Sequence, residues 1–238
     1  MQYRGGKYRL RDDIAAELIN YLPESNVFID MFCGAANISV AMLKKHPNLD
    51  VYANDISKPL ITMFNALKAG WIPPDDLSKD QWIQLKADQD VYNPLTAFAG
   101  FGCSYAGNWF SGYATNTRSD DFCMQAKNSL IRDLDYIKKI NFSSSDYYKY
   151  RLPETPVLIY CDIPYKHTSK YIYKFDHVEF YKWCEQTKNK GHTIIVSEYF
   201  ENVEDVRSNN IIWCKKSKCN MGANGKHLKS TTEVLIKI

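Results

Sequence analysis

Short apolar runs alternate with segments of helical periodicity in the first part of the chain. Residues 27–32 and 50–55 are apolar runs typical of buried strands. Each is followed by a segment with helical spacing, residues 37–45 and 57–68, and the second begins with a serine at the predicted N-cap. A further helix is predicted over residues 12–22. This alternation predicts a parallel α/β sheet.

The same pattern returns in the last third of the chain. Residues 155–161 and 192–199 are predicted strands, and residues 178–188 form the helix between them. Residues 211–214 and 233–238 are predicted as the final strands. Together the segments predict a Rossmann-like sheet of about seven strands.

The middle of the chain has no strong strand pattern. Between residues 70 and 136, aromatic side chains are interleaved with polar ones, and four glycines cluster between residues 100 and 112. We therefore expect an inserted, mostly helical subdomain over 70–136, within a main domain formed by 1–69 and 137–238.

Composition narrows the class of protein. Hydrophobic residues make up 45% and charged residues 24% of the 238 positions, which argues against disorder. Because no apolar run approaches the roughly 18 residues of a membrane span and no signal peptide is visible, we expect a soluble, cytoplasmic protein. The seven cysteines, without regular spacing, predict reduced thiols rather than a disulfide framework or a zinc site.

The net charge of +3 is weak evidence for an anionic partner, and the distribution of the charges is more informative. No acidic residue lies between Asp205 and Glu233, a stretch that contains Lys215, Lys216 and Lys218 among its basic residues. The stretch is either solvated surface or a surface that faces phosphates, and charge alone leaves both interpretations open.

Two loops at predicted strand ends carry candidate chemistry. Residues 30–36 run from a strand through small residues into a helix, an arrangement that favours a bound cofactor, and Asp55 at the next strand end could accept the hydroxyls of a ribose or cap the following helix. Residues 162–165, Asp-Ile-Pro-Tyr, follow the strand 155–161 and form either a ligand-binding edge or an ordinary turn.

Five motifs then resemble one family, in the family's order. Residues 162–165 resemble the DPPY motif of amino-methyltransferases, residues 30–36 their AdoMet-binding loop, and residues 3–7 the GGK motif of Dam-type (D12 class) DNA adenine methyltransferases. Residues 54–55 and 142–147 resemble the segments that hold the ribose and adenine of AdoMet, and residues 101–104, 109–113 and 196–199 resemble segments of phage-encoded members. Ile163 and Ala36 depart from the usual Pro and Gly.

The resemblance implies the fold, the reaction and the site. It implies a Rossmann-like AdoMet-dependent methyltransferase sheet with an inserted target-recognition subdomain, acting on the N6 amine of adenine in double-stranded DNA, without a metal or a membrane. The catalytic residues it implies are Asp162, Ile163, Pro164 and Tyr165. Those implied for AdoMet are Tyr3, Gly6, Lys7, Asp30, Phe32, Gly34, Asp55, Ile56, Asp146, Tyr147 and Asp162.

Residue type adds candidates for DNA contact. Asparagine and arginine suit the reading of base edges, and lysine suits phosphate contacts. The candidates are Asn108, Asn116, Arg118, Lys127, Arg132, Lys215, Lys216 and Lys218. Three alternatives stay open: an N4-cytosine DNA methyltransferase, an RNA methylase, and a catalytically impaired DNA- or AdoMet-binding relative in which Ile163 disables the site. The recognition sequence, for which the family suggests GATC, and the oligomeric state are left open.

Overall fold

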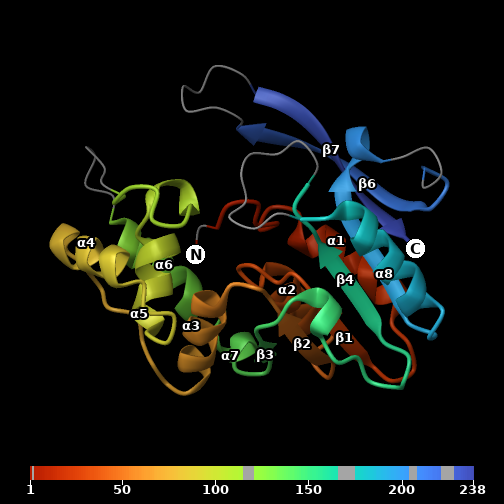
Figure 1. Cartoon of the computed structure of the whole chain (residues 1–238), viewed down its shortest axis with the longest axis horizontal. Coiled ribbons are helices and arrows are strands. Elements are labelled where there is room, and N and C mark those ends of the chain that lie inside the picture. Colours follow the sequence, from red (N-terminus) through yellow and green to blue (C-terminus); the bar gives the residue numbers. More distant parts are fainter. Residues whose placement is uncertain (2, 115–120, 166–174, 204–207, 221–227) are drawn as a thin grey trace.

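A single seven-stranded sheet forms the centre of the protein, in the order β3-β2-β1-β4-β5-β7-β6 (Figure 1). The computed structural model describes the whole chain except residues 2, 115–120, 166–174, 204–207 and 221–227, and except the side chains of 217–220 and 228–230. The strands are β1 (Val27–Asp30), β2 (Asp50–Asn54), β3 (Asn141–Ser143), β4 (Leu158–Asp162), β5 (Thr193–Tyr199), β6 (Ile211–Asn220) and β7 (Leu228–Lys237). Strands β1 to β5 are parallel, and β7 is antiparallel to both of its neighbours, so the predicted α/β sheet is confirmed.

Helices cover both faces of this sheet. The helices are α1 (Arg11–Leu18), α2 (Asn37–Lys45), α3 (Lys58–Lys68) and α8 (His177–Lys188). Phe28 and Leu158 belong to the core that contains α1 to α3, whereas their neighbours Ile29 and Ile159 pack in a second core with Phe180 of α8. This alternation follows from the twofold period of a strand buried on both faces. The helix predicted over residues 12–22 ends at Leu18 and continues as a 3₁₀ turn (Ile19–Tyr21).

The described part of 70–136 consists of helices and turns beside the sheet (Figure 1). Its elements are α4 (Lys79–Asp88), α5 (Pro94–Ala97), a π-helical turn (Phe98–Gly102), a 3₁₀ turn (Tyr105–Gly107), α6 (Phe122–Arg132) and α7 (Leu134–Ile137). Trp82 and Phe98 belong to the same core as Phe64 of α3, so the described part of this region shares a core with the main domain.

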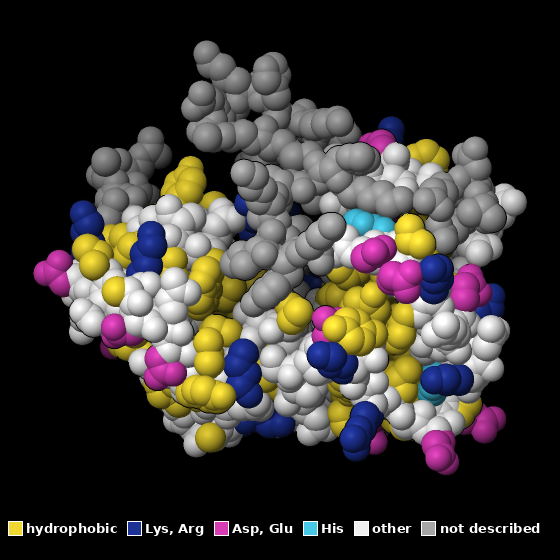
Figure 2. All heavy atoms as spheres, in the orientation of Figure 1, with side chains coloured by type: hydrophobic (Ala, Val, Ile, Leu, Met, Phe, Trp, Pro, Cys, Tyr) yellow, Lys and Arg dark blue, Asp and Glu magenta, His cyan; other side chains and the backbone are white. Residues whose placement is uncertain are grey.

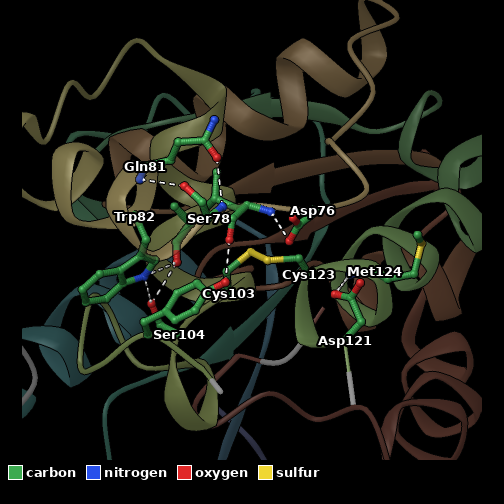
Figure 3. The surroundings of a disulfide bond; sticks show 12 residues. Asp76, Ser78, Gln81, Trp82, Cys103, Ser104, Asp121, Cys123 and Met124 are labelled. Carbon is green, nitrogen blue, oxygen red and sulfur yellow. Dashed lines mark hydrogen bonds between the residues drawn. A yellow bond between two sulfur atoms is a disulfide. The ribbon is translucent and has the colours of Figure 1, made fainter. Parts of the chain in front are cut away.

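A disulfide corrects the expectation of reduced thiols. Cys103, after the π-helical turn, is bonded to Cys123 in the first turn of α6 (Figure 3), and their Cα atoms lie 5.1 Å apart. The fold brings together two cysteines that are 20 positions apart, a proximity that irregular spacing could not reveal. Cys33, Cys161 and Cys184 are buried, as small core residues commonly are.

The last two strands are longer than the sequence pattern predicted. The register pairs Glu233 of β7 with both Tyr199, the last residue of β5, and Lys215 of β6. Residues 216–220 of β6 and 228–232 of β7 therefore extend beyond the carboxyl edge of the parallel strands, where the hairpin projects at the top of Figure 1. Among the described residues, no helix is long and apolar enough to cross a membrane.

Candidate active site

The carboxyl ends of three adjacent strands bring the predicted motifs together. Strand β1 pairs with β2 on one side and with β4 on the other. Phe32, Asp55 and Asp162, which follow or end these strands, therefore share one edge of the sheet. Ligands of open α/β sheets bind at this edge.

The N-terminal segment packs onto the loop that follows β1. Gly34 has φ +47°, and a Cβ built on it would lie 2.9 Å from Cε1 of the Tyr3 ring. A Cβ on Gly6 would lie 3.0 Å from the Tyr3 carbonyl oxygen. Both glycines thus permit a close approach that a side chain would prevent, and the segments resembling the GGK motif and the AdoMet loop are in contact.

Ala36 occupies a backbone position that favours glycine. Its φ of 56° and ψ of 25° lie in the left-handed region, at the N-cap of α2. An alanine in that region costs about 1 kcal/mol relative to glycine. The replacement of the family's usual Gly is therefore a strained one, which the sequence alone left undecided.

Asp55 organises the loop and the start of α3. Its Oδ2 accepts a hydrogen bond from the Gly34 amide at 2.9 Å, and its Oδ1 accepts from the Ser57 amide at 2.8 Å. Ser57 stands at the predicted N-cap of α3, but its side chain makes no capping hydrogen bond. Burial raises the pKa of Asp55. Each carboxylate oxygen retains a lone pair that a ligand hydroxyl can use, and the neighbouring Ile56 is 43% exposed.

Asp30 lies beneath this loop and is only 1% exposed. Its Oδ2 accepts from the Ser39 hydroxyl at 2.7 Å, whereas its Oδ1 has no hydrogen-bond partner within the described structure. Burial raises the pKa of Asp30 to about 7. In this structure Asp30 contacts α2 rather than the open edge of the sheet.

Asn54 fixes the segment after β3, a role that the sequence analysis missed. Its Oδ1 accepts from the Ser145 amide at 3.0 Å, and its Nδ2 donates to the Ser145 carbonyl at 3.0 Å. Asp146, which follows, is half-buried. The Tyr147 ring lies 5.7 Å from that of Phe32, within an aromatic cluster that includes Phe180. Hydrophobic side chains gather on the surface of this region in Figure 2.

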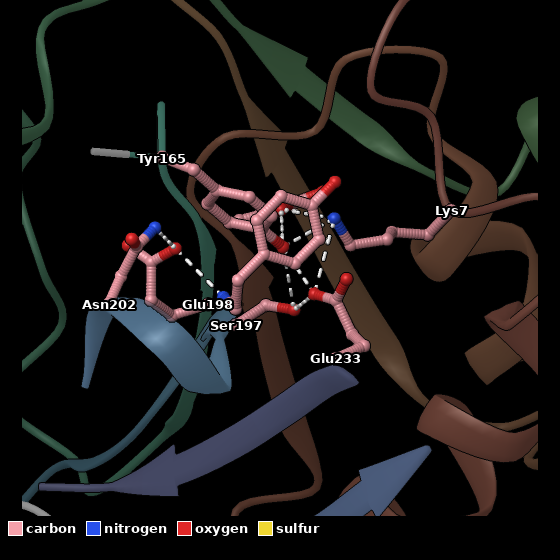
Figure 4. A network of polar contacts seen from close by, with 8 residues as sticks. Lys7, Tyr165, Ser197, Glu198, Asn202 and Glu233 are labelled. Carbon is pink, nitrogen blue, oxygen red and sulfur yellow. Dashed lines mark hydrogen bonds and ion pairs between the residues drawn. The ribbon is translucent and has the colours of Figure 1, made fainter. Parts of the chain in front are cut away.

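A buried polar network links Lys7, Tyr165, Ser197 and Glu233 (Figure 4), and the carboxylate of Asp162 takes part in it. Nζ of Lys7 lies 2.9 Å from Asp162 Oδ1 and 3.4 Å from Glu233 Oε1. The Tyr165 hydroxyl accepts from Lys7 and lies 3.1 Å from Asp162 Oδ1, and it also donates to Glu233. Ser197 Oγ donates to Glu233 Oε1 at 2.6 Å. Sequence reasoning found Lys7, Asp162 and Tyr165 but not Glu233, which lies far along the chain on β7.

Charge determines the state of this network. Burial opposes the charged form of Lys7, but the carboxylates of Asp162 and Glu233 outweigh burial, so the pKa of Lys7 is raised. Burial raises the pKa of Glu233, while Lys7 lowers it. Burial and the same carboxylates hold the pKa of Tyr165 well above its ordinary value. The lysine is therefore an ammonium, and the phenol is un-ionised.

The Tyr165 ring is enclosed rather than open. Nζ of Lys7 lies 4.5 Å from its centroid, and the Tyr199 ring meets it edge-on with centroids 4.4 Å apart. A base that stacked on Tyr165 would have to displace one of these neighbours. Lys7, which the family resemblance places among the AdoMet-binding residues, has its ammonium at Asp162 and Glu233 in this structure.

The two residues between Asp162 and Tyr165 are held by packing. The Ile163 side chain is 2% exposed and belongs to the core that contains Phe180. The carbonyl oxygen of Pro164 lies 2.8 Å from Nε2 of His177 in α8. Packing in the core therefore restricts which side chains position 163 can carry.

The candidates for DNA contact are distributed over several surfaces. Asn108 accepts from Arg4 at 3.0 Å, Lys127 pairs with Asp75 at 2.5 Å, Arg132 lies 3.7 Å from Asp133, and Lys215 pairs with Asp13. Lys216 is exposed on β6. Asn116, Arg118 and the Lys218 side chain lie outside the described residues. No group of metal-ligating side chains occurs in the part of the chain that the structure describes.

Comparison with known proteins decides the family. The model of the D12 class N6 adenine-specific DNA methyltransferases matches residues 3–214. The chain belongs to this family. Membership confirms the predicted family and makes S-adenosyl-L-methionine (AdoMet) the cofactor.

One solved structure is similar to this chain over nearly the whole of the chain's length. It is the crystal structure of SMU.472, named "a putative methyltransferase complexed with SAH", with 10% sequence identity and a TM-score of 0.41. The match covers 99% of this chain but 55% of the other, so the chain spans about half the length of that protein.

The residues at the sheet edge fit AdoMet chemically. Asp55 has spare lone pairs for ribose hydroxyls, and the exposed Ile56 beside it offers an apolar surface for a nucleoside. The half-buried Phe32 and Tyr147 add aromatic surface at the same edge. These are the kinds of contact that an adenosine moiety requires.

Proposed function

We propose that this methyltransferase moves the methyl group of AdoMet to the N6 amine of an adenine that is flipped out of double-stranded DNA. The observation that carries the proposal is the position of Asp162, at the end of β4, beside the loop after β1 and followed by Ile163-Pro164-Tyr165. Membership in the adenine-specific family supports the choice of base.

The chemistry needs two acceptors beside the target amine. The lone pair of an exocyclic amine is delocalised into the ring, so the amine is a poor nucleophile until its hydrogens are held and its lone pair is aimed. Asp162 supplies one acceptor, and the backbone carbonyl of Ile163 supplies the second. When bound, AdoMet supplies the electrophilic methyl group. The protein contributes mainly position, which is a large source of rate.

A base inside a duplex cannot reach this edge of the sheet, so it must leave the helix. Flipping costs a few kcal/mol, and stacking on an aromatic ring returns roughly 1–3 kcal/mol. Tyr165 is the ring assigned to that role, which requires the Tyr199 ring, packed edge-on against it, to move. The AdoMet contacts assigned are the ribose hydroxyls to Asp55 and the adenine amine to Asp146.

Recognition of a short site is assigned to the region 70–136 and to the β6–β7 hairpin. Asn108 and the basic residues of β6 belong to these elements and offer the side chains that contact base edges and phosphates. The family resemblance suggests GATC as the site.

Transfer of tritiated methyl from AdoMet to unmethylated duplex DNA tests the proposal. Digestion to nucleosides should give N6-methyladenine, and Asp162→Ala should lower the rate by about 100-fold or more while the protein remains folded. Glu185→Gln, on the exposed face of α8, is the control. Label on cytosine or only on RNA, or an Asp162→Ala variant with full activity, would contradict the proposal.

A further inference from the structure

Glu233 is a buried carboxylate whose contacts with described residues lead to the active site. It is 2% exposed and lies on β7, the strand that runs opposite to its neighbours. Its Oε1 accepts from the hydroxyls of Ser197 and Tyr165, and it lies 3.4 Å from Nζ of Lys7. One oxygen atom thus holds side chains from three distant segments of the chain.

Burying a carboxylate is costly unless its partners compensate for the lost water. A hydrophobic residue at this position would fill the core without that cost, so stability alone does not account for a glutamate here. The Tyr165 hydroxyl and the Lys7 ammonium, which Glu233 holds, are also the groups that contact Asp162 Oδ1. The chain of contacts therefore runs from the sheet, through Glu233, to the carboxylate assigned to the target amine.

The geometry explains why this support is useful. Lys7 has a long side chain on the N-terminal segment, and Tyr165 lies in the loop after β4, whereas Ser197 and Glu233 lie on paired strands inside the sheet. Among the described residues, both contacts of the Asp162 carboxylate use Oδ1. The Asp162 side chain is 21% exposed, so a substrate can reach its carboxylate.

We propose that Glu233 is a positioning residue for methyl transfer. It holds the Tyr165 hydroxyl and the Lys7 ammonium, which fix Oδ1 of Asp162 and leave the second oxygen directed toward the target amine. This inference rests on the proposed function and adds a residue that acts through Tyr165 and Lys7 rather than by touching the substrate.

Single-turnover methyl transfer separates positioning from a purely structural role. The amplitude reports the fraction of active protein, and the rate constant reports the geometry of the active sites. Glu233→Ala should lower the rate constant about 100-fold, the scale for a misplaced catalytic group, while AdoMet affinity measured by calorimetry stays within about threefold of wild type. Glu233→Gln, whose Oε1 still accepts from Ser197 and Tyr165, should restore the rate constant to within about tenfold of wild type.

Glu198→Gln is the matched control. Glu198 is also 2% exposed, but its carboxylate accepts from the Tyr199 amide and the Asn202 side chain. Its rate constant should equal that of wild type.

The second measurement tests whether Glu233 and Tyr165 affect the rate constant through the same interaction. It can be made even if Glu233→Ala folds poorly. Tyr165→Phe removes the hydroxyl and keeps the ring, so combining it with Glu233→Leu, which removes the carboxylate and still fills the core, should give a rate constant no lower than that of the slower single variant. The inference would be overturned if the two substitutions reduced the rate constant by fully multiplicative factors. It would also be overturned if Glu233→Ala lowered the amplitude but not the rate constant. Either result would leave the proposed function intact. A wild-type protein without methyl transfer would overturn both.

Discussion

At the scale of single residues, Ile163 is where the sequence departs most visibly from its family and where the structure changes the expectation. Ile favours the extended backbone, and the residue before a proline is pushed to the same region, so Ile163 and Pro164 can hold nearly the geometry of two prolines. The buried Ile163 side chain also packs in the core, a second reason for a rigid loop. A proline at position 163 is therefore not required for activity.

Ile163→Pro should therefore change the single-turnover rate by less than about tenfold, or 1.4 kcal/mol. It should lower the free energy of unfolding by about 1–2 kcal/mol, because the proline ring fills less of the core than Ile. Urea denaturation and single-turnover kinetics measure the two effects. Ile163→Val, which keeps the β-branched side chain, is the control and should retain the full rate. A wild-type protein that binds DNA and AdoMet without methylating, and is activated by Ile163→Pro, would contradict this prediction.

At the scale of elements, the sequence predicts some strands and helices well and others poorly, for physical reasons. Strands β1, β4 and β5 are apolar runs buried on both faces, so their pattern alone identifies them. Strand β3 is only Asn141–Ser143 and lies at the sheet edge, where it exists because it pairs with β2. The Lys-rich part of β6 likewise becomes a strand through pairing with β7, a long-range contact that composition does not encode.

Asp30, the last residue of β1, makes stability depend on pH. Because burial raises the pKa of Asp30 to about 7, the folded protein binds a proton between roughly pH 4 and 7 that the unfolded chain lacks. The free energy of unfolding should therefore fall as the pH rises through this window, by up to about 1.4 kcal/mol per unit for one such group. Glu198, whose pKa burial raises to about 7, contributes in the same direction.

Asp30→Asn removes the first of these groups. In urea denaturation without AdoMet, the variant should lose less stability between pH 5 and pH 8 than wild type, by on the order of 2 kcal/mol. Asp50→Asn is the control, because the Asp50 side chain is exposed and solvated in the folded and unfolded states alike. The same pH dependence in wild type and Asp30→Asn would show that Asp30 is ionised throughout the range.

At the scale of the whole molecule, the active-site network depends on contacts between distant segments. The motifs around Lys7 and Asp162 are readable in the sequence because each is a local pattern. Glu233 is not, because its role appears only when antiparallel β7 brings it beside β5, and Ala36 is undecided until its backbone conformation is known. The disulfide between Cys103 and Cys123 is invisible for the same reason. Local patterns thus predict the motifs, whereas the long-range contacts that support them require the fold.

The β6–β7 hairpin gives the last prediction. Residues 216–220 extend beyond the carboxyl edge of the sheet, on the side of Asp162, and the exposed Lys216 begins that extension. If this edge faces DNA, Lys216 neutralises a phosphate, and binding releases counterions. Lys216→Ala should then reduce the slope of log affinity against log salt concentration by about 0.9. Fluorescence anisotropy with a labelled duplex across a range of salt concentrations measures the slope.

Lys190→Ala is the matched control for this measurement. Lys190 is equally exposed but precedes β5, at the amino edge of the sheet and opposite the active site. Its substitution should leave the slope at the wild-type value, since a charge on that edge contacts no phosphate when DNA lies across the carboxyl ends. A slope that falls for Lys190→Ala and not for Lys216→Ala would place the DNA on the other edge. Equal slopes for all three proteins would make the acid-free stretch ordinary solvated surface, because counterion release counts only the phosphates that the protein neutralises.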